Sequence, residues 1–176
     1  MTNTEFVDRA IEFARIKHNT PSDCQRYGSL PYTVHTDAVA AVGERYMYYI
    51  PLELRDKVRA ALHLHDTIED TDVSEKLLTK LFGAEVADIV FRVSNERGRN
   101  RKERNFKTYP KIWRNEYAIF VKLADRIANT TNSKNTGYKM FKTYKAEYAV
   151  FRYALKVNGC FPDMWAELDE LNDFKN

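Results

Sequence analysis

The chain is poor in the residues that interrupt helices. Among its 176 residues there are only 6 glycines and 5 prolines, and most stretches repeat their apolar residues with a helical rather than an alternating period. Hydrophobic residues make up 44% and charged residues 30%, a composition that excludes an intrinsically disordered chain. We therefore expect an all-α bundle that forms one domain over residues 1–176, a length sufficient for a sizeable core.

Several further features of the sequence narrow the class of protein. There is no run of about 18 apolar residues that would span a membrane, and the N-terminal sequence MTNTEFVDRA lacks the basic-then-apolar pattern of a signal peptide. The two cysteines, Cys24 and Cys160, favour a reduced, cytoplasmic protein with free thiols over a disulfide. The net charge of +3 does not argue for a nucleic-acid partner, and a small anionic ligand suits it equally well.

The hydrophobic pattern predicts about eight helices and no sheet. The expected helices cover residues 4–18, 33–49, 52–70, a short stretch capped by Asp72 and ended by Gly83, and residues 84–94, 116–132, 140–156 and 162–173. Residues 19–32 have the proline, glycine, serine and asparagine content of a loop, and residues 95–105 are expected to form a basic connector.

One predicted helix carries an unusual number of ionisable groups, in the stretch ALHLHDTIEDTD (61–72). On a continuous helix, His65 and Glu69 are four residues apart, as are Asp66 and Asp70, so the four side chains form one stripe. Three carboxylates on a packed face are costly unless a cation or protons neutralise them. A divalent metal ion does so directly. His65 and Asp66 point about 100° apart on a regular helix, but they can still converge on an ion that lies over the edge between them. His63 lies on another side and is expected to be structural.

Two other segments supply candidate ligands for such an ion. His35 opens the second predicted helix, and Asp125 lies inside an apolar run in VKLADRIAN, where an unpaired aspartate would be expensive. Taken with His65 and Asp66, they form a mixed imidazole and carboxylate set that suits Mn²⁺ or Fe²⁺ and, less exclusively, Mg²⁺ or Zn²⁺. Taken alone, His35 and Asp125 each have a simpler interpretation. His35 can be a capping or core histidine, and Asp125 can be the partner of an arginine.

The order His, His-Asp, Asp resembles that of the HD-domain metal-dependent phosphohydrolases. Four segments, RYGSLPYTVH (26–35), HDTIEDT (65–71), FGAEVADIVFRVS (82–94) and VKLADRIAN (121–129), are similar to the (p)ppGpp hydrolase domain of Rel/SpoT enzymes, above all to the small stand-alone hydrolases such as the metazoan SpoT homologue. The likeness extends over about residues 6–157. It implies an HD-domain helical bundle with phosphohydrolase activity.

The resemblance also implies roles for individual positions. The family's metal ligands, usually of Mn²⁺, correspond to His35, His65, Asp66 and Asp125. Its catalytic positions correspond to the acidic pair Glu69 and Asp70 and to Asn129, near the ribose and the attacking water. Its substrate contacts correspond to Arg26, which stacks on guanine, and to Tyr148.

The chain departs from the family around the base and the phosphates. Tyr27 follows Arg26 where the family often has a lysine, and either residue can stack on a purine. The basic segment 97–104, which includes Arg104, can clamp a polyphosphate through bidentate donors, and its alternative is a solvated loop. These departures bear on which substrate is used more than on the chemistry.

We therefore expect hydrolysis of the 3′-pyrophosphate of (p)ppGpp to GDP or GTP and pyrophosphate. A second hypothesis keeps the site and changes the substrate to NADPH or a nucleoside 3′-phosphate. A third, from a different class, is a catalytically silent nucleotide-binding regulator. In each case the expected partner is a small nucleotide, without a membrane or a specific nucleic acid, and the sequence leaves the oligomeric state open.

Overall fold

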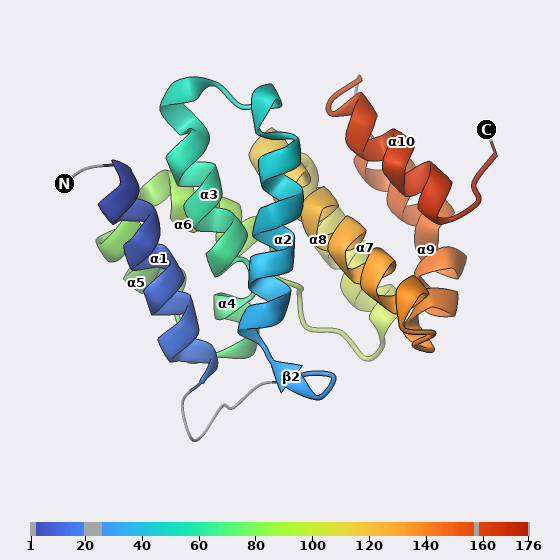
Figure 1. Cartoon of the computed structure of the whole chain (residues 1–176), viewed down its shortest axis with the longest axis horizontal. Helices are drawn as coiled ribbons and strands as arrows, with labels where there is room; N and C mark the ends of the chain where they lie inside the picture. Colours follow the sequence, from blue (N-terminus) through green and yellow to red (C-terminus); the bar gives the residue numbers. More distant parts are fainter. Residues whose placement is uncertain (1–2, 20–25, 157–158, 176) are drawn as a thin grey trace.

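The computed structural model describes residues 3–19, 26–156 and 159–175, and within these ranges helices dominate (Figure 1). The α-helices are α1 (Asn3–His18), α2 (Thr33–Arg45), α3 (Arg55–Leu64), α4 (Thr67–Asp70), α5 (Glu75–Phe82), α6 (Ala84–Val93), α7 (Arg101–Trp113), α8 (Glu116–Asn135), α9 (Met140–Leu155) and α10 (Pro162–Leu171). Two 3-10 turns, η1 (Met47–Tyr49) and η2 (Leu52–Leu54), connect α2 to α3. The expected all-α bundle is confirmed. Across these described ranges, no helix is both long enough and apolar enough to cross a bilayer.

Helix α8 lies at the centre of the bundle, where it packs against α2, α6, α7, α9 and α10. Asn115 begins this helix, because its side chain accepts hydrogen bonds from two main-chain N–H groups of the first turn. Every residue from 118 to 128 is buried, although this stretch includes Lys122, Asp125 and Arg126. Charged side chains at such positions are costly unless they are paired, so α8 carries a polar site inside the core.

The third predicted helix is not continuous, so the prediction of a single helix over residues 52–70 is wrong. It is divided into η2, α3 and α4, and two residues, His65 and Asp66, separate α3 from α4. The Thr67 hydroxyl donates a 2.7 Å hydrogen bond to the Leu64 carbonyl, satisfying a group that is left over where α3 ends. Both intervening residues keep φ and ψ in the right-handed helical region. The spacing of apolar residues in the sequence therefore does not reveal the break.

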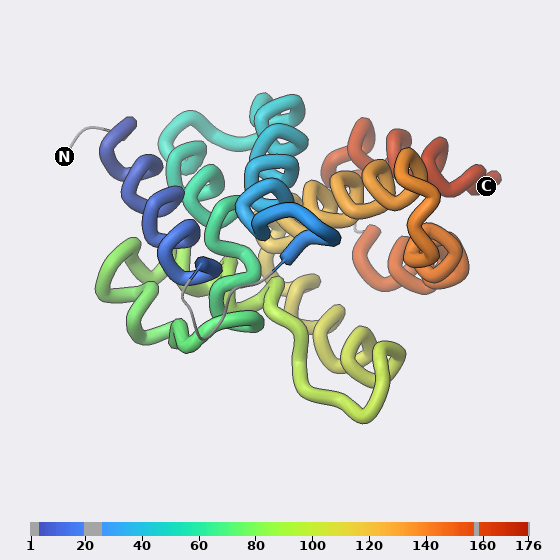
Figure 2. Tube along the Cα trace, turned by 60° about the horizontal axis from the view of Figure 1, so that its bottom comes forward, coloured from blue at the N-terminus to red at the C-terminus, as the bar shows by residue number. Residues whose placement is uncertain are grey.

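Helix α7 is missing from the sequence prediction, which treated residues 95–105 as a connector. Asn100 caps this helix by accepting a 2.9 Å hydrogen bond from the Glu103 N–H, and an asparagine followed three residues later by a glutamate is a typical helix start. Pro110 inside the helix and the basic composition obscured this signal. Figure 2 shows the segment from residue 95 through α7 standing out from the body of the bundle.

The predicted loop over residues 19–32 contains a small hairpin, so the expectation of no sheet needs a correction. Strands β1 (Arg26–Tyr27) and β2 (Leu30–Pro31) pair in antiparallel register. Gly28 occupies the turn with φ of +65°, a conformation that side chains other than glycine rarely adopt. This hairpin positions Tyr27 beside the start of α2.

The remaining differences concern helix ends. Helix α2 ends at Arg45 rather than near residue 49. Ser74, not Asp72, caps α5, because its hydroxyl accepts a 3.2 Å hydrogen bond from the Leu77 N–H. Gly83 ends α5 as predicted, with φ of +89°.

The two cysteines are separate cases. Cys160 is a half-buried free thiol, as expected. Cys24 lies outside the described residues, so the prediction of a free thiol there stays a prediction.

Candidate metal centre and cavity

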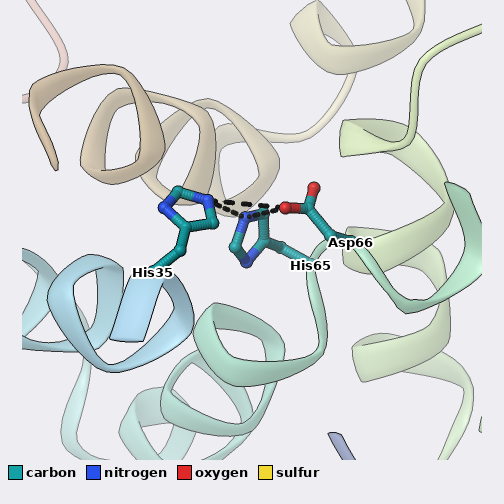
Figure 3. A group of neighbouring side chains, drawn as sticks. All are labelled: His35, His65 and Asp66. Atoms are coloured by element: carbon teal, nitrogen blue, oxygen red, sulfur yellow. Dashed lines mark hydrogen bonds and ion pairs between the residues drawn. The ribbon is translucent and has the colours of Figure 1, made fainter. Parts of the chain in front are cut away.

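Three side chains from two parts of the chain meet at one point in the core (Figure 3). The Nε2 atoms of His35, from α2, and His65, from the end of α3, are 3.3 Å apart. Asp66 Oδ2 lies 2.9 Å from the Nε2 atom of His65 and 3.4 Å from that of His35. Asp125 of α8 brings a fourth group, with Oδ1 3.4 Å from His35 Nε2 and 3.9 Å from His65 Nε2. The structure therefore brings together all four residues that the sequence predicted as metal ligands.

His65 and Asp66, which lie between α3 and α4, converge although they are neighbours in the chain. On a regular helix, the side chains of His65 and Asp66 would diverge by about 100°. Here His65 closes α3 and Asp66 precedes α4, and the two groups approach to 2.9 Å. Asp66, Glu69 and Asp70 line one cavity, so the carboxylates that the sequence placed on one stripe do lie near each other.

The donor atoms fit a divalent metal ion. His65 Nδ1 lies 2.9 Å from the Leu62 carbonyl oxygen, which can only accept, so this nitrogen carries the proton and Nε2 keeps its lone pair toward the site. Two imidazole nitrogens and two carboxylates that face one point form a donor set that divalent ions take. Without an ion or protons, these groups repel each other at such separations.

Both carboxylate oxygens of Asp125 have polar partners on α8. Its Oδ2 atom forms an ion pair of 3.0 Å with Lys122 Nζ, and its Oδ1 atom accepts a hydrogen bond from the Asn129 amide. The Asn129 oxygen in turn accepts a 3.2 Å hydrogen bond from the Tyr27 hydroxyl. Asp125 is thus paired with a lysine, and not with an arginine as the simpler interpretation of the sequence supposed. Asn129 stands beside the metal centre, as its predicted role requires.

Before a metal ion binds, the centre holds its protons on the imidazoles. Burial alone would lower the pKa of His35, but its hydrogen bonds to Asp125 and Asp66 outweigh burial and raise that pKa to about 9. Burial would also lower the pKa of His65, and the nearby charge of Asp66 reverses that shift. Burial would raise the pKa of Asp125, yet the Lys122 ammonium and the His35 ring hold it well below its usual range.

Metal binding at pH 7 is therefore expected to release protons from the imidazoles. His35 is protonated below its folded pKa of about 9 and must lose that proton before Nε2 can bind a cation, so affinity should rise with pH toward 9. Titration calorimetry with Mn²⁺ in two buffers of different ionisation enthalpy measures the release. An apparent enthalpy that does not change with the buffer would contradict it.

Two tyrosines flank the centre. The Tyr27 ring stacks on His35 with centroids 4.9 Å apart, and the Tyr32 hydroxyl donates a hydrogen bond to Asp66 Oδ2. Burial and the charge of Asp66 raise the pKa of Tyr32, which keeps it a donor. These contacts fix the orientation of a histidine and a carboxylate that would otherwise rotate.

The predicted acidic pair lies on the α4 side of the same cavity. Glu69 receives two hydrogen bonds from Asn95, one of 2.9 Å from the main-chain N–H and one of 3.0 Å from the side-chain amide. Lys111 holds the segment beside Asn95 by donating to the Ser94 carbonyl over 2.9 Å. Burial and the charges of the neighbouring carboxylates raise the pKa of Asp70 to about 6. Glu69 is thus fixed in orientation, and Asp70 is set to exchange a proton near neutral pH.

The cavity around these groups has a volume of about 220 Å³ and is lined by charged groups of both signs. The carboxylates of Asp66, Glu69, Asp70 and Asp125 line it together with the cations of Arg101, Lys122 and Arg126 and the ring of Tyr144. The Arg126 guanidinium lies 4.9 Å from the centroid of the Tyr144 ring. A cavity that combines candidate metal ligands with fixed arginines suits a polyanion such as a phosphorylated nucleotide.

Three predicted substrate contacts do not line this cavity. Arg26 is exposed on the hairpin, where its guanidinium lies 3.5 Å from the Ser29 carbonyl oxygen. Tyr148 is buried in the core, where its hydroxyl donates a 2.6 Å hydrogen bond to Asp169 of α10. Arg104 is half-buried on α7 and is also absent from the lining. Of the four predicted contacts, only Tyr27 lies at the cavity.

Other residues stand where those contacts were expected. Arg101, the first residue of α7, lines the cavity in place of Arg104, and Tyr144 lines it one turn before Tyr148 on α9. Lys122 and Arg126 also line it. Both belong to the VKLADRIAN segment, and their charge inside an apolar helix was the available signal.

Sequence comparison finds several relatives that are named as guanosine-3′,5′-bis(diphosphate) 3′-pyrophosphohydrolases. The chain is 32% identical over 129 residues to guanosine-3′,5′-bis(diphosphate) 3′-pyrophosphohydrolase MESH1 of Danio rerio, a match that covers 73% of this chain and 69% of that one. It is 27% identical over 180 residues to the pyrophosphohydrolase of the same substrate from Aquifex aeolicus, covering 98% of this chain. The match spans only 24% of that longer bacterial relative.

Structure comparison agrees on the fold. The chain superposes on a solved metazoan SpoT orthologue, described as hydrolysing ppGpp, with a TM-score of 0.75, 24% identity and coverage of 94% of this chain and 93% of that one. No protein-family model matches the sequence. The identity to the Danio rerio enzyme, over more than two thirds of both chains, is the decisive finding. This chain belongs to the family of guanosine-3′,5′-bis(diphosphate) 3′-pyrophosphohydrolases.

Proposed function

We propose that this protein is a metal-dependent phosphohydrolase that removes the 3′-pyrophosphate of (p)ppGpp, giving GDP or GTP and pyrophosphate. The observation that carries the proposal is the meeting of His35, His65, Asp66 and Asp125, in a chain whose relatives carry this activity in their names. Residues 1–176 are taken as one hydrolase domain. The substrate is a small nucleotide.

Mn²⁺ is the proposed ion, held by His35, His65, Asp66 and Asp125. The mixed set of imidazole and carboxylate donors supports it, since carboxylates suit Mn²⁺ and imidazoles tolerate it. When bound, such an ion lowers the pKa of water, polarises a phosphoryl oxygen and offsets negative charge.

The chain's own residues have separate tasks in this proposal. Hydrolysis of the bond between O3′ and phosphorus requires that water lose a proton and that O3′ gain one. Glu69, oriented by Asn95, accepts the proton from water, and Asp70, with a pKa of about 6, returns one to the leaving oxygen. Asn129 donates a hydrogen bond near the reacting group without competing as a charged ligand.

The arginines of the cavity complete the proposed mechanism. Arg101 and Arg126 line the same cavity as the proposed ligands, where they offset the charge of the phosphate groups, while Lys122 is paired with Asp125 over 3.0 Å. Arg101 and Arg126 are both directed by Glu147, with contacts of 2.7 Å and 3.6 Å, so they are held in place before the substrate arrives. Fixed charges of this kind stabilise a transition state without reorganising during the reaction.

Tyr27 supports a second candidate function, a phosphatase acting on NADPH or another nucleoside phosphate. It occupies a position where the resembling family often has a lysine, and it presents an aromatic face beside His35. Stacking on a ring tolerates different bases, so the base specificity of this enzyme is expected to be broad.

A side-by-side assay of ppGpp, NADPH and GTP with Mn²⁺ tests the proposal. We expect kcat/KM for ppGpp to exceed that for GTP about 10²-fold or more, because a 5′ chain binds with its phosphorus displaced from the reacting position. Equal values for GTP and ppGpp would refute the assignment, and a higher value for NADPH would support the second candidate. Tight nucleotide binding without any turnover would instead support a silent regulator.

A further inference from the structure

One face of the molecule exposes an apolar surface that the catalytic cavity does not use. Phe106, Pro110 and Trp113 follow each other at helical spacing on α7, and Val150 and Tyr153 do so on the neighbouring helix α9. The exposed fractions are 78% for Phe106, 54% for Trp113, 64% for Val150 and 93% for Tyr153. Together these side chains line a groove of about 850 Å³, here called the α7/α9 face.

The apolar area of this surface is comparable to the largest patch on a typical monomer, and such patches are often functional. An aromatic side chain presents ~150–250 Å², so Phe106, Trp113 and Tyr153 leave roughly 350–550 Å² of apolar area in water. A typical monomer rarely has a contiguous apolar patch larger than a few hundred Å². A stable interface buries about 800 Å² on each partner, so three rings of the α7/α9 face already supply about half of that area.

We infer that the α7/α9 face binds a second copy of this chain. In a dimer with two-fold symmetry, each surface meets itself and must therefore carry both a projecting and a receiving part. The α7/α9 face has both, because Phe106 and Tyr153 are largely exposed while Tyr109, which lines the same groove, is buried. Enrichment in tyrosine, tryptophan and phenylalanine is also typical of interface cores.

The same face borders the catalytic cavity without forming part of it. Asn105 lines both the groove and the cavity. Glu147 lines the groove and holds Arg101 of the cavity through a 2.7 Å hydrogen bond. A second copy would therefore lie next to Asn105 and Glu147, the residues that connect the groove to the cavity. The inference does not depend on the proposed function.

Sedimentation velocity of the whole protein over a wide concentration range tests this inference. We expect wild-type protein to dimerise, and the double variant Phe106→Ser/Tyr153→Ser to raise the dimer dissociation constant about 100-fold or more, because central aromatic residues dominate interface energies. The control variant is Tyr138→Ser, an aromatic residue 52% exposed between α8 and α9 and outside the groove. It should dimerise like wild type.

Hydrogen exchange locates the contact. Amides of α7 and α9 should become more protected as the wild-type concentration rises. A wild-type monomer at every concentration overturns the inference, and so does a dimer that the double variant leaves intact or that protects other helices. If the double variant fails to fold by circular dichroism, the single change Tyr153→Arg at the rim serves in its place.

Discussion

Replacing Asp66 with asparagine is expected to abolish stoichiometric binding of a divalent metal and to lower ppGpp turnover by about 10³-fold or more. The Asp66 carboxylate lies within 3.4 Å of the Nε2 atoms of both His35 and His65, and an amide in its place is a weaker, neutral donor. Several kcal/mol of charge stabilisation then disappear with the ion, and each 1.36 kcal/mol corresponds to tenfold in rate.

The measurement is metal content by elemental analysis after gel filtration, together with turnover at saturating Mn²⁺. Asp37→Asn is a matched control, because it removes the same charge from α2, two residues from His35, at a half-exposed side chain outside the cavity lining. It should keep both metal and activity. Full metal occupancy in purified Asp66→Asn would show that this carboxylate is not a ligand.

Glu69→Gln and Asp70→Asn are each expected to keep the metal and to lower turnover by ~10²–10⁴-fold, the range typical of a lost general acid or base. Both side chains line the cavity but lie outside the group of His35, His65 and Asp66 that could hold a metal ion. The amide in Glu69→Gln keeps the shape of the carboxylate and loses its basicity. With Asp70→Asn, the activity profile should also lose its inflection near pH 6, the folded pKa of Asp70.

Glu75→Gln is the control for these two variants, because it changes an exposed glutamate in the first turn of α5. It should match wild type in metal content, turnover and pH profile. Wild-type turnover in Glu69→Gln would remove Glu69 from the role of base, and loss of metal from either variant would assign it to the ligand set instead.

The four candidate ligands could be found from the sequence because each is a chemically unusual residue in an apolar segment. Packing alone does not account for a histidine and aspartate pair at the end of α3 or for an aspartate inside the buried stretch of α8. The break between α3 and α4 could not be found in this way, since His65 and Asp66 keep helical backbone angles. At the break, the Thr67 hydroxyl donates to the Leu64 carbonyl, a contact that apolar spacing does not predict.

The residues that line the cavity were harder to predict, because their positions depend on how the helices pack against each other. Tyr144 and Tyr148 are one turn apart on α9, and α10 takes the second through Asp169 while the first remains at the cavity. Arg101 and Arg104 are likewise one turn apart on α7, a helix that the sequence prediction lacked. Tertiary packing, which no local pattern encodes, decided both choices.

The order of the proposed ligands along the chain determines when the centre can be completed during synthesis. His35, His65 and Asp66 leave the ribosome first, and at ~5–20 residues per second Asp125 follows His35 by about 5–20 s. Asp125 arrives on α8, the same helix that supplies the centre of the core. Contacts of such long sequence separation form late in folding. A nascent chain therefore acquires its full set of metal donors in the same step in which its core closes.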